Sequence, residues 1–203
     1  MLAKKDQTFT LSHSEFIILG LIGEEPTHGY GIISNKIQER GMQNWTRIGD
    51  IGKSSIYRIL KELEKRGLAQ ARKTKSEKGR ESKEYSITDF GVKVLKHKII
   101  SVLSEFLGKN DEDFYVAYSN MYILKKDEIK TALSSSIEKL KVHIKELEEM
   151  LKIYEDRKLD METLEIRGLF VHPIMVMEKD IEFLEWVLDE LNKVEGTING
   201  TKQ

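Results

Sequence analysis

The sequence of 203 residues predicts a mainly α-helical protein with a small two-stranded β-hairpin near its middle. Three observations lead to this prediction. Apolar residues recur at helical spacing in three segments before residue 67, as they do on the buried face of an α-helix. The pattern changes to that of a hairpin over residues 68–87. Helical spacing then returns and fills most of the second half of the chain.

The chain begins with a polar stretch, residues 1–10, that we expect to be flexible. Ser12 or Ser14 can cap a first helix, which Pro26 interrupts. A second helix is expected over roughly residues 29–40, where apolar residues share one face.

A third helix is expected over about residues 54–66. It sends its apolar residues inward and ends at Gly67. Either Ser54 or Ser55 can serve as its cap. The long loop before it, residues 45–55, leaves the start of this helix open.

A β-hairpin follows the third helix. Residues 68–74 form a short strand, a charged turn with one glycine comes next, and residues 83–87 form the return strand. Thr88 can cap a further helix, which stops near Gly108. Three helices followed by a basic two-stranded hairpin are typical of a winged helix-turn-helix. We therefore expect residues 11–108 to form such a domain together with a linker helix.

Charge is divided unequally along the chain, although the net charge is only −1. Residues 1–98 carry 19 basic and 12 acidic residues, whereas residues 99–203 carry 14 and 22. Within the first part, residues 47–83 hold 12 basic and 5 acidic residues. A basic segment joined to an acidic one indicates that one part faces nucleic acid and the other has a different task. The helix at 54–66 would then enter the major groove, while the wing, residues 68–87, follows the phosphate backbone.

The second half of the chain contains two narrow apolar stripes. Both alternate between spacings of three and four residues, which is typical of a coiled-coil seam. We expect residues 109–194 to form an antiparallel helical dimerisation domain and residues 195–203 to form a flexible tail. Pro173 should kink the second helix or mark its start. The predicted dimerisation residues are Leu140, Ile144, Leu147, Leu151, Ile174, Met177, Ile181, Leu184 and Leu188.

The sequence lacks the residues that several other functional classes need. The chain has no cysteine, and its five histidines show no metal-ligand spacing, so we expect no metal site. It has no nucleophile elbow and no glycine-rich phosphate loop, so we expect neither an enzyme nor a cofactor. The longest apolar run has eight residues, and the N-terminus lacks the apolar core of a signal peptide. We therefore expect a cytoplasmic protein without a membrane partner.

Three segments of the N-terminal half form a specific series. They are LSHSEFIILGLIGEEPTHGYGI (residues 11–32), SSIYRILKELEKRGLA (residues 54–69) and GRESKEYSITDFG (residues 79–91). In this order and at this spacing they resemble the PadR family of transcriptional regulators. The length and helical pattern of the second half resemble the longer PadR subgroup, which has a multi-helix C-terminal dimerisation domain. The resemblance implies a homodimeric repressor, less often an activator, of an operator in double-stranded DNA. It also implies a small-molecule effector such as a phenolic acid or a drug.

The residues predicted to contact DNA lie on the second and third helices and in the wing. The resemblance and the placement of charge suggest Tyr30, Lys53, Ser54, Ser55, Tyr57, Arg58, Lys61, Lys73, Lys75, Lys78 and Arg80. Each has a simpler alternative. The serines could be helix caps, the tyrosines could be packing residues with a solvated hydroxyl, and the cations could form a solvated face.

Two other functions fit the same elements. The chain could be a winged-helix protein-interaction module without specific DNA binding, or a small-molecule-binding protein whose helices enclose a pocket. Aromatic residues that could line such a pocket are more often core residues, and an effector pocket would be expected at the dimer interface. These aromatic residues are Tyr115, Tyr118, Tyr122 and Trp186, and the first three form a stripe at helical spacing together with Phe114.

Overall fold

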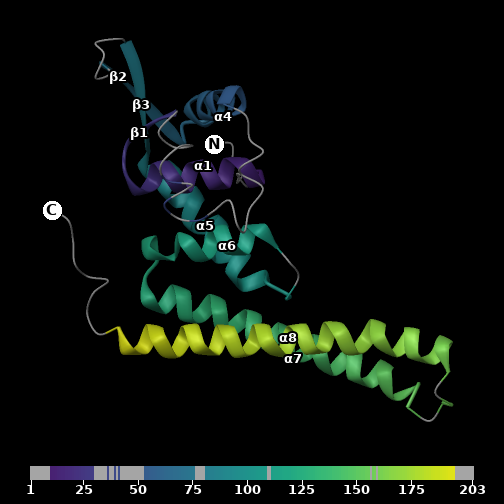
Figure 1. Ribbon diagram of the computed structural model, residues 1–203. Coiled ribbons are helices and arrows are strands. Elements are labelled where there is room, and N and C mark those ends of the chain that lie inside the picture. Colours follow the sequence, from purple (N-terminus) through teal and green to yellow (C-terminus); the bar gives the residue numbers. More distant parts are fainter. Residues whose placement is uncertain are drawn as a thin grey trace, which may run out of the picture. The chain divides into compact units, whose positions relative to one another are not determined.

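A computed structural model describes residues 10–29, 36, 39, 41, 53–75, 81–108, 111–155, 157–158 and 160–194. The described part is mainly helical with one small antiparallel sheet, which confirms the predicted fold class (Figure 1). Its elements are α1 (His13–Glu24), β1 (Thr27–His28), α4 (Lys53–Lys65), β2 (Ala69–Lys75), β3 (Glu81–Ile87), α5 (Asp89–Glu105), α6 (Glu112–Ser119), the 3-10 turn η4 (Met121–Ile123), α7 (Lys126–Lys152) and α8 (Met161–Lys193). The predicted helix over residues 29–40 lies almost wholly outside the described residues.

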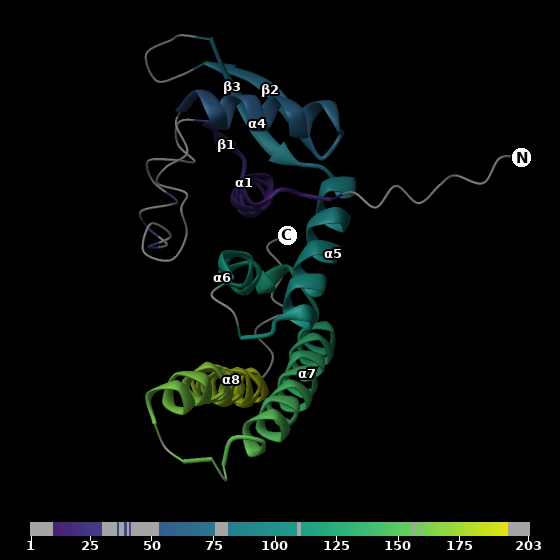
Figure 2. The same cartoon turned by 90° about the vertical axis from the view of Figure 1, so that its right-hand side faces the viewer.

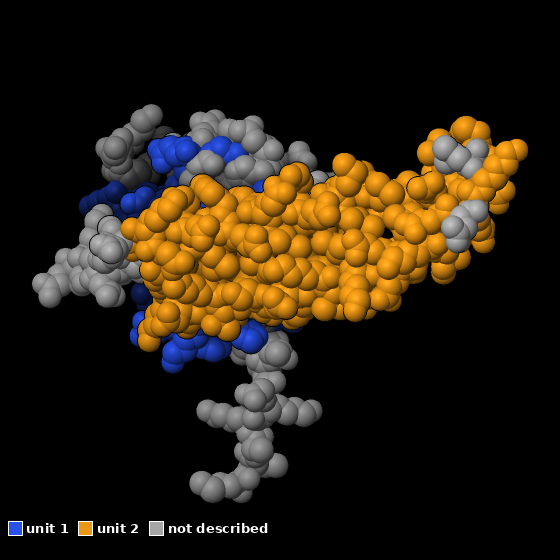
Figure 3. Space-filling view, turned by 90° about the horizontal axis from the view of Figure 1, so that it is seen from below, with its two compact units in different colours: residues 1–99, 112–120 blue, residues 100–111, 121–203 orange. Residues whose placement is uncertain are grey.

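The chain forms two compact units, which Figure 3 shows in different colours. The first contains residues 1–99 and 112–120, and the second contains residues 100–111 and 121–203. Helix α5 therefore runs through the boundary in the sequence. Helix α6 belongs to the first unit, and residues 100–108 belong to the second.

Helix α1 is the centre of the first unit. Ser12 is its N-cap, because the Ser12 hydroxyl accepts from the Glu15 amide while the Glu15 carboxylate accepts from the Ser12 amide at 2.8 Å. Residues 16–22 are all buried, so α1 is covered on all sides. Lys36 occupies the other end of the helix, where its Nζ donates to the Leu21 carbonyl oxygen at 2.9 Å. Of the two predicted caps, the structure selects Ser12.

The sheet has three strands in the order β1-β3-β2, all antiparallel (Figures 1 and 2). The two-stranded wing expected from the sequence is thus extended by β1, in which Thr27 pairs with Tyr85. Pro26 precedes this strand, and proline cannot continue the hydrogen bonds of a helix. The side chain of His28 reinforces the pairing, since its Nδ1 lies 3.2 Å from both the Lys83 carbonyl oxygen and the Ser82 hydroxyl oxygen.

Helix α4 lies against both α1 and the hairpin (Figure 2). It begins at Lys53, one residue before the predicted start, and Gly67 follows its end at a φ of 71°. At this backbone angle a glycine is favoured. The predicted cap of the next helix is confirmed, because the Thr88 hydroxyl accepts from the Gly91 amide at 2.9 Å.

An ionic cluster joins three helices of the first unit. His13 Nδ1 of α1 lies 2.6 Å from one carboxylate oxygen of Asp113 in α6, and Lys98 Nζ of α5 lies 2.6 Å from the other. Burial acts to raise the pKa of Asp113, but the hydrogen bonds from His13 and Lys98 outweigh burial and lower it. Close by, the buried side chain of Asn120 lies directly against Gly20 of α1, where an added Cβ would come within 2.8 Å of the amide atoms.

Helices α7 and α8 form a long antiparallel pair in the second unit (Figure 1). Asp160 caps α8 by accepting from the Thr163 amide at 2.8 Å. Helix α8 is continuous from Met161 to Lys193 with Pro173 inside it, so the expectation that a helix starts at Pro173 is wrong. Packing against α7 holds the helix together across the missing backbone hydrogen bond.

The two predicted stripes face each other within one chain. Their central members are buried in the α7–α8 pair, with Leu140 and Leu184 fully covered. Of the predicted dimerisation residues, Leu140, Ile174, Met177, Ile181 and Leu184 are buried in this way, and Ile144, Leu147, Leu151 and Leu188 are half-buried.

Candidate nucleic-acid interface

Helix α4 presents one apolar face and one polar face. Ile56, Leu60 and Leu63 are fully buried and anchor the helix to the first unit. Among the described residues, neither Arg58 nor Lys61 has an ion pair, and both are exposed. The polar face therefore carries cations that are available to a partner. Its exposed members are Ser54, Arg58, Lys61, Glu62 and Lys65.

Ion pairs to two neighbouring elements fix the position of α4. Just beyond its end, Arg66 Nη1 lies 2.7 Å from the Glu15 carboxylate of α1. The Ser12 and Arg66 hydrogen bonds lower the pKa of Glu15 although its burial acts to raise it. On the other side, Glu64 of α4 accepts from Lys83 of β3 at 3.5 Å. The first contact joins the end of α4 to α1, and the second joins α4 to β3.

One face of the wing concentrates positive charge. Lys73 of β2 stands directly opposite Lys83 of β3, and like charges in this position destabilise a sheet. Lys83 has Glu64 as its partner, whereas Lys73 is exposed and has no ion pair among the described residues. Cross-strand partners point to the same face, so Lys73 lies on the side of the wing that faces α4. Lys75 lies two residues further along and is exposed, opposite Glu81.

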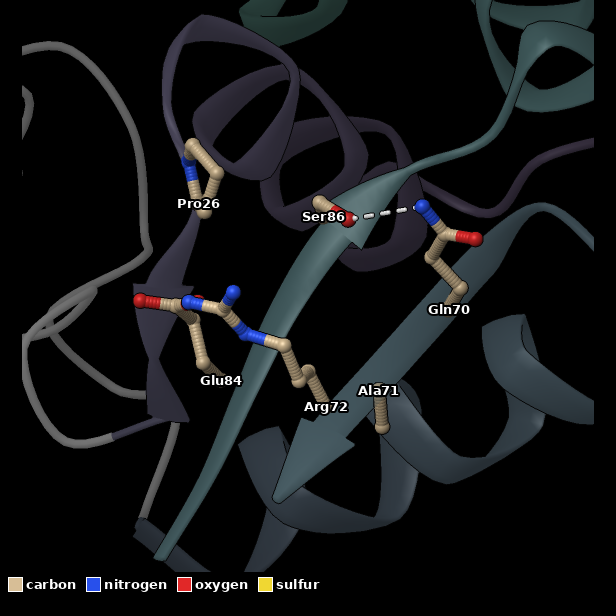
Figure 4. A pocket seen from close by; sticks show the side chains of 6 residues that line it. All are labelled: Pro26, Gln70, Ala71, Arg72, Glu84 and Ser86. Atoms are coloured by element: carbon tan, nitrogen blue, oxygen red, sulfur yellow. Dashed lines mark hydrogen bonds and ion pairs between the residues drawn. The ribbon is translucent and has the colours of Figure 1, made fainter. Parts of the chain in front are cut away.

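The other face of the wing is electrically balanced. Arg72 Nη2 lies 3.0 Å from the Glu84 carboxylate, and the Gln70 amide donates to the Ser86 hydroxyl at 3.3 Å. Figure 4 shows these four side chains with Pro26 around a shallow hollow of about 420 Å³. Because the cation is already paired, we assign this face no part in binding a polyanion.

Tyr57 stands at the edge between the two faces of α4, with 38% of its surface exposed. It precedes Arg58 and lies one turn before Lys61. The neighbouring Tyr85 of β3 is almost fully buried, and this burial raises the pKa of its hydroxyl while Lys83 acts in the opposite direction. Tyr85 is thus a core residue, whereas Tyr57 is open to a partner.

The predicted DNA-binding residues differ in how much of them the structure describes. Those that are described lie on α4 and on one face of the wing, and both elements belong to the first unit. Ser54 and Ser55 lie inside the first turn of α4, so neither is its N-cap. Lys53 begins the helix, but its side chain is not described. Tyr30, Lys78 and Arg80 lie outside the described residues.

Sequence reasoning missed two contributors to this site. Lys83 was not predicted as a site residue, although a register that pairs residues 69 and 87 would have placed it opposite Lys73. Gly29 was not predicted as a contact of Tyr57, and the only available signal was its place in the His28-Gly29-Tyr30 triplet.

The aromatic residues after α5 do not behave as one group. Phe114 is buried, and its ring stacks on that of Tyr118 at 6.3 Å, which is core packing. Tyr115 and Tyr122 are exposed, as is Trp186, which stacks on Phe183 at 5.9 Å. Within the described part of the chain, no group of histidines and carboxylates is arranged to hold a metal ion, and no described helix is long and apolar enough to span a bilayer.

A buried helical core, a helix whose exposed face carries Arg58 and Lys61, and a three-stranded antiparallel sheet together define a winged-helix domain. Residues 18–97 match the model of the transcriptional regulator PadR-like family. This segment of the chain is therefore a PadR-like domain, as the sequence series at residues 11–91 predicted. PadR-like proteins are transcriptional regulators.

Solved structures of low identity also resemble the chain. PadR of Bacillus subtilis in complex with operator DNA is 20% identical, with 88% of this chain and 99% of that chain covered and a TM-score of 0.42. The same protein in complex with p-coumaric acid gives 21% identity, 88% and 98% coverage and a TM-score of 0.37. A protein of Streptococcus mutans is 25% identical, with 88% and 99% coverage and a TM-score of 0.37. No curated protein sequence matches the chain.

Proposed function

We propose that the protein is a cytoplasmic homodimeric repressor that reads an operator in double-stranded DNA. Helix α4 lies in the major groove and the Lys73 face of the wing follows the adjacent phosphate backbone. The observation that carries the proposal is the exposed face of α4, where Arg58 and Lys61 have no ion pair among the described residues while Ile56, Leu60 and Leu63 anchor the opposite face. A helix that carries cations without an ion pair among the described residues suits a polyanionic groove.

The dimer proposal uses the outer face of α8. Leu164, Met175 and Trp186 are spaced by 11 residues, which is three helical turns, so they form one line along the helix. They are 53%, 59% and 52% exposed. Exposed apolar residues in a row mark an interface, and a second copy of the chain is the partner that we propose, because two-fold homodimers are the most common assemblies.

Release from DNA by a small molecule completes the proposal. It rests on the PadR-like domain, and PadR of Bacillus subtilis has been crystallised with p-coumaric acid. A set of phenolic acids, added to the protein–DNA complex, tests it through the loss of DNA affinity. Ligand binding that leaves DNA affinity unchanged would contradict a regulatory effector.

Fluorescence anisotropy tests the DNA proposal directly. Labelled duplex from the region upstream of the gene is compared with scrambled duplex at two salt concentrations. We expect tight, selective and salt-dependent binding. Replacing Arg58 and Lys61 with alanine should abolish selectivity while leaving the helical spectrum intact. The matched control replaces Lys145 and Lys179, which are exposed on α7 and α8, and should bind like the wild type.

Two outcomes would contradict the proposal. Unchanged binding by the Arg58→Ala/Lys61→Ala variant would show that α4 does not read the operator. No binding to any duplex at low salt would favour the protein-interaction module instead.

Sedimentation tests the dimer. Met175→Lys should convert a dimer into a helical monomer, since it places a charge in the apolar line of α8. Met150→Lys, at an exposed methionine of α7, is the matched control and should stay dimeric. A monomeric wild-type protein at micromolar concentration would refute the dimer.

A further inference from the structure

Gly29 lies directly after β1, with its backbone against the ring of Tyr57. A Cβ atom at Gly29 would be 2.6 Å from Tyr57 Cε1 and 3.1 Å from Cδ1 and Cζ. Carbon atoms in contact are normally 3.5–4.0 Å apart, so no other residue fits while the ring keeps this position. The backbone angle does not require glycine, because the described glycines with positive φ are Gly41, Gly67 and Gly108. The close approach of the Tyr57 ring is therefore the reason that position 29 requires glycine.

The backbone on the Gly29 side of this contact is held in place. His28 pairs with Glu84 in the sheet, and its Nδ1 lies 3.2 Å from the Lys83 carbonyl oxygen and from Ser82 Oγ. A chain segment tied in this way at the preceding residue has little freedom to withdraw. An added methyl group would therefore displace the Tyr57 ring rather than the strand.

The backbone on the Tyr57 side is held as well. The preceding residue, Ile56, and Leu60 one turn later are both fully buried. The Cα of Tyr57 is consequently fixed, and only rotation of its side chain can relieve a clash. The ring lies between Gly29 and the exposed face that carries Arg58 and Lys61, and a tyrosine and a lysine four residues apart are neighbours on a helix.

We propose that Gly29 is a positioning residue that holds the Tyr57 ring so that its hydroxyl donates to a phosphate of the bound DNA. The inference rests on the proposed function, since it concerns the same interface. A phenolic hydroxyl is a neutral donor of the kind that fixes a protein's register on the duplex without reading its sequence. Gly29 itself touches no DNA and acts only through Tyr57.

A double-mutant cycle tests the inference by anisotropy on the operator and on scrambled duplex. Gly29→Ala and Tyr57→Phe should each weaken binding by the dimer about a hundredfold, because each of its two subunits loses a hydrogen bond to a charged group that contributes about tenfold, and by the same factor on both duplexes. In a Tyr57→Ala background the ring is absent, so Gly29→Ala should change neither affinity nor thermal stability. This lack of additivity distinguishes positioning from a general loss of structure.

Gly23→Ala is the matched control. Its Cβ would lie 3.5 Å from Ile87 Cδ1 and Leu95 Cδ2, which is ordinary contact, so the variant should bind DNA like the wild type. If Gly29→Ala does not fold, the double variant with Tyr57→Ala must still fold and must bind as Tyr57→Ala does.

Four results would overturn the inference. The first is that the effects of Gly29→Ala and Tyr57→Ala on affinity are additive, and the second is that Tyr57→Phe binds like the wild type. The third is that Gly29→Ala binds like the wild type, and the fourth is that the double variant fails to fold. In each case the wild-type protein still binds its operator, and the proposed function survives. Absence of wild-type binding would instead refute the proposed function and this inference together.

Discussion

Replacement of Lys73 by threonine should have opposite effects on DNA binding and on stability. Lys73 faces Lys83 across the wing and has no ion pair among the described residues. Its removal relieves a like-charge pair, and threonine favours strands, so the free energy of unfolding should stay unchanged or rise by up to about 0.5 kcal/mol. Loss of one phosphate contact in each subunit of the proposed dimer should reduce the magnitude of the slope of log K against log salt by about 1.8. Between 50 and 200 mM salt, this change corresponds to about a 12-fold smaller loss of affinity.

The assay is a salt titration of operator affinity, measured together with urea unfolding. Arg72→Thr is the control, since Arg72 is paired with Glu84 on the other face of the wing. The control should leave the salt slope unchanged and lower stability by no more than about 1 kcal/mol, because the pair is exposed. An unchanged slope for Lys73→Thr would refute the assignment of this face to the DNA backbone. A large loss of stability would refute the argument from like charges.

Three further outcomes are expected. Leu140→Ala should lower the free energy of unfolding by about 2–5 kcal/mol in urea, because Leu140 is fully buried between helices, and a smaller cost would contradict that packing. The pKa of Asp113 is lowered in the folded protein, so its ionised form contributes stability at pH values above the ordinary pKa of an aspartate. This stability is lost as the pH falls through the lowered pKa, and Asp113→Asn should therefore flatten the decrease of stability at acid pH. Gly20→Ala should lower the melting temperature, since its Cβ would come within 2.8 Å of Asn120, whereas Gly168→Ala, which meets nothing within 4 Å, should raise it.

Much of the first unit could be predicted because its signals are local. The cap of α1 at Ser12 and that of α5 at Thr88 depend on residues three positions away. The extent of α4 is likewise predicted from nearby residues, namely the spacing of its apolar residues and the glycine after its end. The cationic face follows directly from that helical spacing. Element boundaries were accordingly close to those observed.

The errors have a common physical cause. Strand β1 has only two residues and exists because β3 offers it hydrogen bonds, so nothing local marks it. The stripes on α7 and α8 were correctly read as seams, but a seam specifies an apolar partner without saying which one. In the structure, the other helix of the same chain supplies that partner. Pro173 was expected to kink a helix or to begin one, and only the second expectation is wrong, because α8 is continuous through Pro173.

The sequence by itself determined the helical class, the basic hairpin, the division of charge and the PadR-like series, because each depends on neighbours along the chain. Only the tertiary structure decided that Lys83 stands opposite Lys73, that Gly29 touches Tyr57 and that Leu184 is buried within the chain. Each of these contacts is made between residues that lie from 10 to more than 40 positions apart in the sequence. Strand register and helix docking bring such positions together, and both are set by burial of the whole unit rather than by local preference.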